Sequence, residues 1–344
     1  MITATPPQEV HSLLPGAPDL RQIAHDSLGS WLSYRETLRP RYWLAWCEIA
    51  LCVAMILGGF AAHLILNLRF GNALGFETAI PFALWIGFWF HALLSYAHEA
   101  VHYNLSASRK RNDLLSDWIV LLFFPQTTKE YRKNHWQHHL HLGDPLDTEV
   151  SYHNCLSMGF LFKAVTGIYM AELAAQSVPA GDSRAQTSRD PLTGSRPRTG
   201  TKSVGPILRA LTAHSILVAI ALSLSCYAAA IAWVVAALFI FPFFTTVRQV
   251  LEHRAIEARC ATDFRYETHG PVNRVFGGGL FAHFYGAAGF DQHLLHHWDP
   301  TISYTRFAEM KDFLDGTPLG PELQSAESTY LSSFLLLLRQ SRRG

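Results

Sequence analysis

Three apolar stretches dominate the pattern of hydrophobic and polar positions along this chain. The first two, residues 43–66 and 78–97, are each close to the roughly 20 helical residues that cross a bilayer core. The third, residues 210–247, contains no Asp, Glu, Lys or Arg and is long enough for two crossings with a turn near 223–227. The pattern therefore predicts an all-α integral membrane protein with about four transmembrane helices, at residues 43–66, 78–97, 210–228 and 229–247.

The other segments are shorter or more polar. Residues 114–124 and 156–175 are apolar but interrupted by charged side chains, so both are predicted to lie at the membrane interface rather than to cross it. Residues 178–204 are rich in Ser, Thr, Pro, Gly and Arg, which predicts a flexible loop. With residues 1–42 as a polar N-terminal segment, the chain is predicted to form a single membrane domain over residues 1–344.

The basic residues are distributed unevenly over this predicted topology. With four spans, every Lys and Arg except Arg69 falls on one side of the membrane. Because short loops rich in Lys and Arg stay in the cytoplasm, that side is predicted to be cytoplasmic. Hydrophobic residues make up 49% of the chain and charged residues 16%, below the usual share of about a quarter in a soluble domain. The net charge of +1 gives no support for a nucleic-acid partner.

The five cysteines do not form a metal-binding or redox pattern. Their number is odd, no Cys-x-x-Cys occurs, and Cys47 and Cys52 lie within the first apolar stretch. We therefore expect neither a disulfide framework nor a thiolate zinc site.

Three clusters of histidines carry the candidate chemistry. Their spacing of three or four residues places the side chains on one face of an α-helix, about 5–6 Å apart at Cβ. The clusters are His98 and His102; His135, His138 and His139; and His293, His296 and His297. All three fall on the predicted cytoplasmic side, where they can converge. Eight imidazoles without a thiolate are too many for one ion, so two metal ions are predicted, and the spacing alone leaves iron, copper and zinc open.

The order of these clusters, HxxxH followed by HxxHH and a second HxxHH, resembles that of the membrane fatty acid desaturase and hydroxylase superfamily. Flanking residues are similar too, with Glu99 inside the first cluster, Asp144–Pro145 after the second and Asp299–Pro300 after the third. The resemblance covers roughly residues 43–307. It implies a cytoplasmic helical cap that holds the histidines and two iron ions, which activate O₂ to oxidise an unactivated C–H bond.

The resemblance also implies functional residues outside the three clusters. The family usually adds a ligand just after the last span, where His253 lies, and Gln249, one turn earlier, is a candidate to hold a metal-bound water. His141 is a candidate ligand or neighbour of the metals, and His283 is a candidate pocket residue or neighbour of the ligands. His91 is a candidate channel residue or, equally, a buried hydrogen-bonded histidine.

Carboxylates near the clusters are candidate partners of the histidines, because metal-bound imidazoles usually donate their other N–H to an acceptor. The candidates are Glu99, Asp144, Asp147, Glu149, Glu252, Asp291 and Asp299. Asp144 and Glu252 are the two that the sequence favours.

The predicted function is that of an O₂-dependent di-iron membrane oxidase acting on a lipid acyl chain, with a fatty acid desaturase as the leading interpretation. A fatty acid or carotenoid hydroxylase or ketolase of the same superfamily is the first alternative. A membrane metal transporter or haem electron carrier is the alternative from another class. No fused electron carrier is visible, so a separate donor such as a ferredoxin or a cytochrome b5-like protein is predicted. An apolar tunnel between the spans is expected, with Trp118, Trp136 and Trp298 at its mouth or at the membrane interface.

Overall fold

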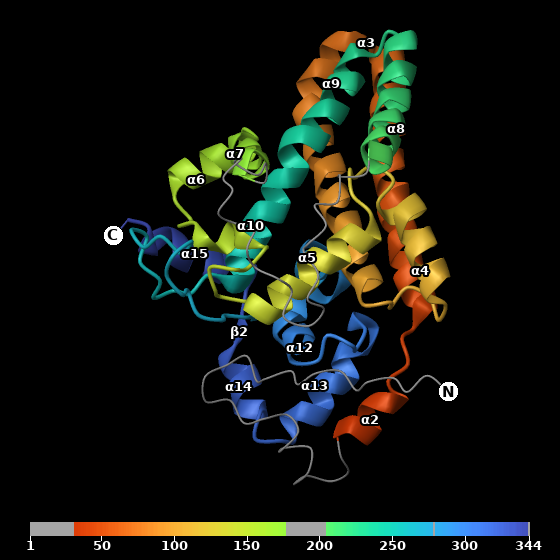
Figure 1. Ribbon diagram of the computed structural model, residues 1–344. Helices are drawn as coiled ribbons and strands as arrows, with labels where there is room; N and C mark the ends of the chain where they lie inside the picture. The colour runs from red at the N-terminus through yellow and green to blue at the C-terminus, as the bar shows by residue number, and fades with distance from the viewer. Residues whose placement is uncertain (1–30, 177–203, 278, 343–344) are drawn as a thin grey trace.

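The computed structural model describes residues 31–176, 204–277 and 279–342. It is mostly helical, with a bundle of long helices at one end and a group of shorter helices at the other (Figure 1). The predicted loop at residues 178–204 lies almost wholly outside the described residues, as does most of the N-terminal segment 1–42.

The first long helix, α3 (Tyr42–Val101), is a hairpin of two helical arms. Its interior holds one non-helical residue, Gly71, with φ 82° and ψ 168°, a backbone region essentially restricted to glycine. Residues 67–77, expected from the sequence to be a loop between two spans, are helical apart from Gly71. The hydrophobic pattern locates the reversal but cannot show that one glycine suffices to make it.

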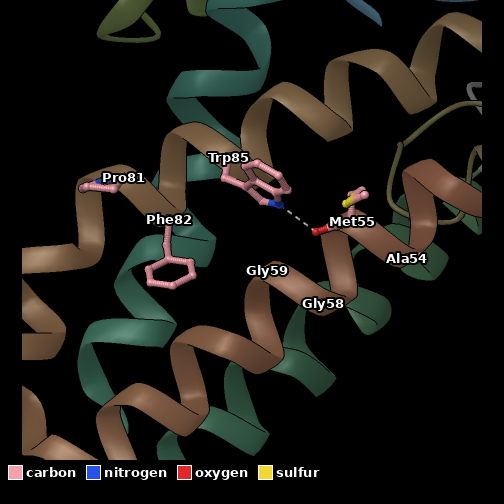
Figure 2. Close-up of a pocket in the computed structure, with 7 residues that line it drawn as sticks. All are labelled: Ala54, Met55, Gly58, Gly59, Pro81, Phe82 and Trp85. Carbon is pink, nitrogen blue, oxygen red and sulfur yellow. Dashed lines mark hydrogen bonds between the residues drawn. The ribbon is translucent and has the colours of Figure 1, made fainter.

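The arms of α3 pack closely and antiparallel. A Cβ at Gly59 would lie 2.7 Å from Cδ1 of Trp85, so only glycine allows this approach. Nearer the hairpin, His63 stacks on Phe82 with 4.4 Å between ring centroids. A small cavity of about 440 Å³ lies between the arms beside Pro81, Phe82 and Trp85 (Figure 2).

The third apolar stretch also reverses once, at the turn that the sequence predicts. The helices are α8 (Val204–Ser223), α9 (Tyr227–Val235), the π-helical η3 (Ala236–Ile240) and α10 (Phe241–His253). Ser225 makes the turn between α8 and α9 with φ 56°, without a glycine. Asn72 Nδ2 donates to the carbonyl of Ser225 at 2.8 Å, which places this turn beside the Gly71 hairpin. We call this end of the bundle the hairpin end.

Three helices are long and apolar enough to cross a membrane: α3, α8 and the continuous helix Tyr227–His253. The chain therefore has the helix lengths and composition of a membrane protein. The predicted interfacial helix over residues 156–175 is two helices, α6 (Met158–Val165) and α7 (Ile168–Gln176), separated at Gly167 with φ 75°. With 8 and 9 residues, neither is long enough to cross.

The shorter helices gather at the end opposite the hairpins (Figure 1). Before α8 they are α2 (Trp31–Thr37), α4 (Arg109–Leu115), η1 (Ser116–Val120), α5 (Thr128–His141) and η2 (Val150–His153). After α10 they are α11 (Gly279–Tyr285), η4 (Ala287–Gln292), α12 (His293–Trp298), η5 (Tyr304–Arg306), α13 (Phe307–Asp315), α14 (Gly320–Ser325) and α15 (Tyr330–Gln340). Two short parallel strands, β1 (Val275–Phe276) and β2 (Glu327–Ser328), tie α15 to the segment before α11.

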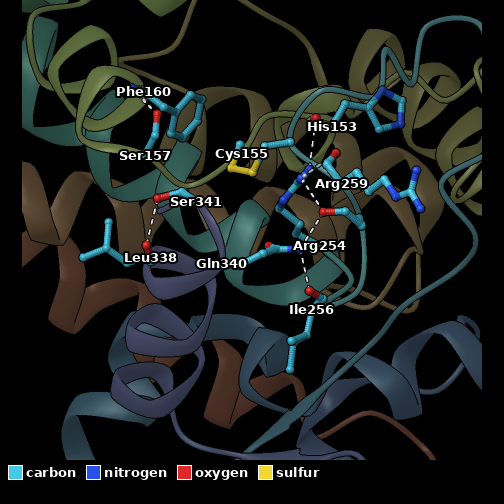
Figure 3. The surroundings of a disulfide bond; sticks show 12 residues. His153, Cys155, Ser157, Phe160, Arg254, Ile256, Arg259, Leu338, Gln340 and Ser341 are labelled. Atoms are coloured by element: carbon cyan, nitrogen blue, oxygen red, sulfur yellow. Dashed lines mark hydrogen bonds between the residues drawn. A yellow bond between two sulfur atoms is a disulfide. The ribbon is translucent and has the colours of Figure 1, made fainter. Parts of the chain in front are cut away.

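One disulfide corrects the expectation from the cysteine pattern. Cys155 and Cys260 are bonded, although 105 residues separate them in the sequence (Figure 3). The buried guanidinium of Arg254 donates to the carbonyls of Tyr152 and His153 at 3.1 Å, so the same two segments are also joined by hydrogen bonds. Spacing rules detect only cysteines that are close in sequence, and the tertiary fold brings this pair together.

Candidate metal centre

Four helix ends deliver the predicted ligands to one place. The last turn of α3 carries His98 and ends at His102, and α10 ends at His253. Helix α5 carries the second cluster and α12 the third. Figure 1 shows α5 next to α12, and Nε2 of His296 lies 2.8 Å from Nε2 of His139. The capping box of Thr127 and Glu130 fixes the start of α5 and hence the register of its histidines.

The nine predicted ligands form two groups in which the candidate donor atoms lie within 4.8 Å of one another. The first group is His98, His102, His135, His139 and His296. The second group is His138, His253, His293 and His297. The rings of His139 and His297 are 4.6 Å apart, so the groups adjoin. The structure thus brings together every predicted ligand, and their binding of metal stays a prediction.

The distances between ring nitrogens fit a bound cation in each group. Nε2 of His296 lies 2.9 Å from Nε2 of His98 as well as 2.8 Å from that of His139. In the second group, Nε2 of His297 lies 3.1 Å from Nε2 of His293. A neutral imidazole has one N–H and one lone pair, so several Nε2 atoms facing one point are poor hydrogen-bond partners for each other and good metal donors.

Burial favours the neutral form of these imidazoles, which is the form that binds metal, and His138 is the exception. Burial lowers the pKa of His139, His296 and His297 well below its ordinary value, and the neighbouring imidazoles lower it further. Their rings are therefore neutral at pH 7. For His138, burial lowers the pKa, but the charges of Glu149 and Asp147 outweigh it and leave the pKa raised.

Three acceptors bind Nδ1 of a histidine and so orient its ring. Asp147 accepts a hydrogen bond from Nδ1 of His138 at 2.9 Å, and Glu149 accepts one from Nδ1 of His135 at 2.9 Å. The carbonyl of Val272 lies 2.9 Å from Nδ1 of His253. Each contact fixes the tautomer and directs Nε2 towards its group.

The two favoured carboxylates do not have this role. Within the described residues, the half-buried side chain of Asp144 forms no hydrogen bond or ion pair with any of the nine histidines. Glu252 forms an ion pair with Arg248 at 3.3 Å on the same helix. The expectation for both is wrong, because nearness in sequence to a ligand does not set the direction of a side chain. Asp147 and Glu149, from the same candidate list, are the ones in contact.

The remaining carboxylate candidates support the fold around the centre. Glu99 accepts from the hydroxyl of Ser303 at 2.7 Å, and Asp299 accepts from Nε1 of Trp31 at 3.1 Å. Burial raises the pKa of Asp291 to about 7.

The other candidates fall in different places. Gln249 donates to Glu149 at 2.9 Å and accepts from the backbone of Ser151, so both ends of its amide are engaged. His91 lines a large cavity and is also buried with both ring nitrogens hydrogen-bonded, to Thr245 Oγ1 and to the carbonyl of Tyr285. His283 pairs with Glu48 at 3.2 Å. Neither group of ligands includes His141. Sequence reasoning missed the Val272 carbonyl and the Gln249–Glu149 pair, because a backbone acceptor and a contact 100 residues apart leave no local signal.

A cavity of about 1140 Å³ lies between the long helices and reaches residues next to the histidine groups, although none of the nine histidines lines it. It is lined by residues of α3, α5, α7, α8, the helix from α9 to α10 and η4, and by the segments before and after α5. Glu149 lines it, and so does Phe290, whose ring lies 4.5 Å from that of His98. None of Trp118, Trp136 and Trp298 is among its lining residues, so their expected place at the tunnel mouth is not found here.

The family model for fatty acid desaturases matches residues 77–319, well over half of the chain. The chain belongs to the fatty acid desaturase family. No curated protein sequence matches it. The matched region of this desaturase-family protein contains all nine histidines of the two groups.

Loss of a single histidine ligand should remove the metal ion from its own group and leave the ion in the other group. We expect His296→Ala or His297→Ala to lower the metal content per chain by about half, because each removes a donor from a different group. Metal analysis of the purified protein measures this, with His141→Ala as the matched control that keeps full content. Full metal content in both ligand variants would contradict the assignment.

Asp147, which accepts a hydrogen bond from His138, should affect metal affinity more than Asp144 in the same loop. Asp147→Asn replaces the carboxylate that accepts from Nδ1 of His138, and we expect metal affinity to fall about 10–100-fold. Asp144→Asn makes the same chemical change three residues away and should leave the affinity unchanged. Competition with a chelator compares the two, and equal affinities would show that the carboxylate contact is unimportant.

Proposed function

We propose that this protein is an O₂-dependent fatty acid desaturase that binds two iron ions. The observation that carries the proposal is the division of nine imidazoles, eight of them buried, into two adjoining groups beside the end of a long cavity. Membership of the fatty acid desaturase family supports an oxidoreductase of this type. Neutral nitrogen donors without a thiolate suit iron, and the count of donors suits two ions.

The residues of the chain have defined tasks in this proposal. The first group would hold one iron and the second group the other. Asp147 and Glu149 keep the rings of His138 and His135 oriented, and Gln249 steadies Glu149. Bound there, iron would supply the activation of O₂ that the C–H bond requires.

The cavity would hold the acyl chain beside the histidines and keep water away from it. Desaturation removes two hydrogens from adjacent carbons and reduces O₂ to two waters, which requires two further electrons and two protons. We propose that a separate carrier, ferredoxin-like or cytochrome b5-like, supplies the electrons one at a time.

We further propose that the chain crosses the membrane four times, with the histidines on the cytoplasmic side. Each arm of α3 forms one crossing, and α8 and the helix from α9 to α10 form the other two. All basic residues except Arg69 then lie on the cytoplasmic side.

Reporter fusions test this topology. Fusions at Gly71 and Ser225 should read periplasmic, because both turns lie at the hairpin end. A fusion at the C-terminus, which serves as the reference for the opposite side, should read cytoplasmic. Opposite readings at Gly71 and Ser225 would contradict four crossings.

The reaction itself is tested with purified protein, iron, a reductase system and isotope-labelled acyl substrates. We expect O₂ consumption and a product lighter than the substrate by two hydrogens, because the cavity would hold an acyl chain beside Glu149 and Phe290, which contact histidines of the first group. The His296→Ala variant is the matched control and should give neither. A product heavier by one oxygen would identify a hydroxylase, and an oxidised pigment would identify a carotenoid enzyme. No O₂ consumption with any of these substrates, despite full iron content, would refute the oxidase.

A further inference from the structure

The large cavity ends before it reaches the histidines, because none of the nine lines it. Within the described residues, three of its lining side chains have a ring contact or a hydrogen bond with one of these histidines: Tyr131, Glu149 and Phe290. The contacts of Tyr131 and Glu149 are both with His135 of the first group. A molecule in the cavity therefore meets these three side chains before it meets the histidines.

Phe290 is the one of these three whose ring contacts both groups of histidines. Its ring centroid lies 4.5 Å from that of His98, which belongs to the first group. It also lies 4.8 Å from that of His293, which belongs to the second group, and the two rings are stacked with 19° between their planes. A single side chain thus lines the cavity and touches both candidate metal sites.

The backbone before Phe290 holds its ring in place. Ala288 and Gly289, within η4, both adopt left-handed backbone conformations, with φ of 59° and 83°. A buried alanine in this conformation is strained, and it persists only where the surrounding packing fixes it. A Cβ at Gly289 would lie 2.4 Å from Cβ of Tyr304, so η4 is packed directly against η5. The backbone of Phe290 is therefore fixed by its neighbours in the fold.

Arg248 covers the ring of Phe290 and holds it as well. The guanidinium carbon lies 3.5 Å from the ring centroid, which is the geometry of a cation–π contact. The guanidinium is held in turn by Ser95, whose hydroxyl accepts from Nη1 at 2.9 Å, and by the ion pair with Glu252 at 3.3 Å. Arg248 and Phe290 are both buried, so water does not compete for their contact. The ring is thus fixed both through its backbone and through its face.

We propose that Phe290 is a positioning residue, which selects the one carbon of the substrate that comes to lie beside the two histidine groups. A rigid ring at this place restricts the approach of the chain and keeps the neighbouring carbons away from the histidines. Such control matters because a misplacement of about 1 Å can cost about 100-fold in rate. This inference rests on the proposed oxidation of an acyl chain and adds the residue that selects the oxidised carbon.

The position of the oxidised carbon tests this role. Phe290→Leu keeps a buried apolar side chain but removes the flat ring. Phe241→Leu makes the same change elsewhere in the cavity, where the ring contacts Phe90 and Phe124. Each iron-loaded protein turns over one saturated acyl substrate, and fragmentation mass spectrometry locates the new double bond or oxygen. We expect one position from the unaltered protein and from Phe241→Leu, and a mixture of neighbouring positions from Phe290→Leu.

A second measurement needs no turnover. Saturated fatty acids that carry a fluorine label at successive carbons are bound to protein loaded with Co²⁺ in place of iron, with Zn²⁺ as the diamagnetic reference. The paramagnetic relaxation of each label reports how close that carbon lies to the metals. Relaxation should peak at one carbon in the unaltered protein and in Phe241→Leu, and should spread over several carbons in Phe290→Leu. The same sharp peak in all three proteins would overturn the inference, because a side chain with only a structural role does not change which carbon is nearest.

Metal content separates a positioning role from damage to the metal centre. We expect Phe290→Leu to bind as much metal per chain as the unaltered protein. Phe290→Met is the second variant, because methionine fills irregular space with a flexible side chain, and it should give the same mixture of positions. Loss of metal from both variants would make Phe290 part of the framework of the centre and would overturn the positioning role.

The outcomes also separate this inference from the proposed function. If the unaltered protein oxidises no acyl chain with full iron content, the proposed function fails and the inference fails with it. If the unaltered protein and Phe290→Leu oxidise the chain at the same single position, the proposed function stands and only the role of Phe290 is wrong.

Discussion

The convergence of nine imidazoles, eight of them buried, is the constraint on which the rest of the structure depends. Their ring nitrogens approach as closely as 2.8 Å, and several have no hydrogen-bond partner in the described structure, among them Nε2 of His138 and both nitrogens of His102. Buried polar atoms without partners cost free energy unless a cation takes their lone pairs. The helix ends of α3, α5, α10 and α12 hold these rings in two groups, each of which could bind a metal ion.

The residues that orient the histidines lie on two segments of the chain. These segments are joined to each other by a disulfide and by hydrogen bonds. The loop after α5 supplies Asp147 and Glu149, and Gln249 reaches Glu149 from α10. A few residues further along, the Cys155–Cys260 disulfide and the buried Arg254 join the same loop region to the segment after α10. The orientation of the ligands thus depends on contacts between the long helices and the shorter helices at their end.

The same arrangement weighs against the functions of another class. A transporter would be expected to place ionisable residues at mid-span along a pathway, and a haem carrier would be expected to hold axial histidines within the spans. Here the histidine groups lie at the ends of the helices, and the large cavity, whose walls are mostly apolar, reaches residues next to them. Membership of the fatty acid desaturase family agrees with an enzyme that brings a lipid to a metal centre.

The sequence by itself determined the membrane class, the turn near Ser225 and the eight clustered histidines, because these depend on local patterns, whereas His253 came from the family resemblance. Apolar length identifies a long helix, and spacings of three and four residues identify a shared helix face. Only the tertiary structure decided how the histidines divide into two groups and which carboxylates support them. It also decided that Gly71 alone reverses α3 and that Cys155 pairs with Cys260. These features depend on contacts between residues far apart in the chain, and the direction of a side chain such as Asp147 rather than Asp144 follows from the packing around it.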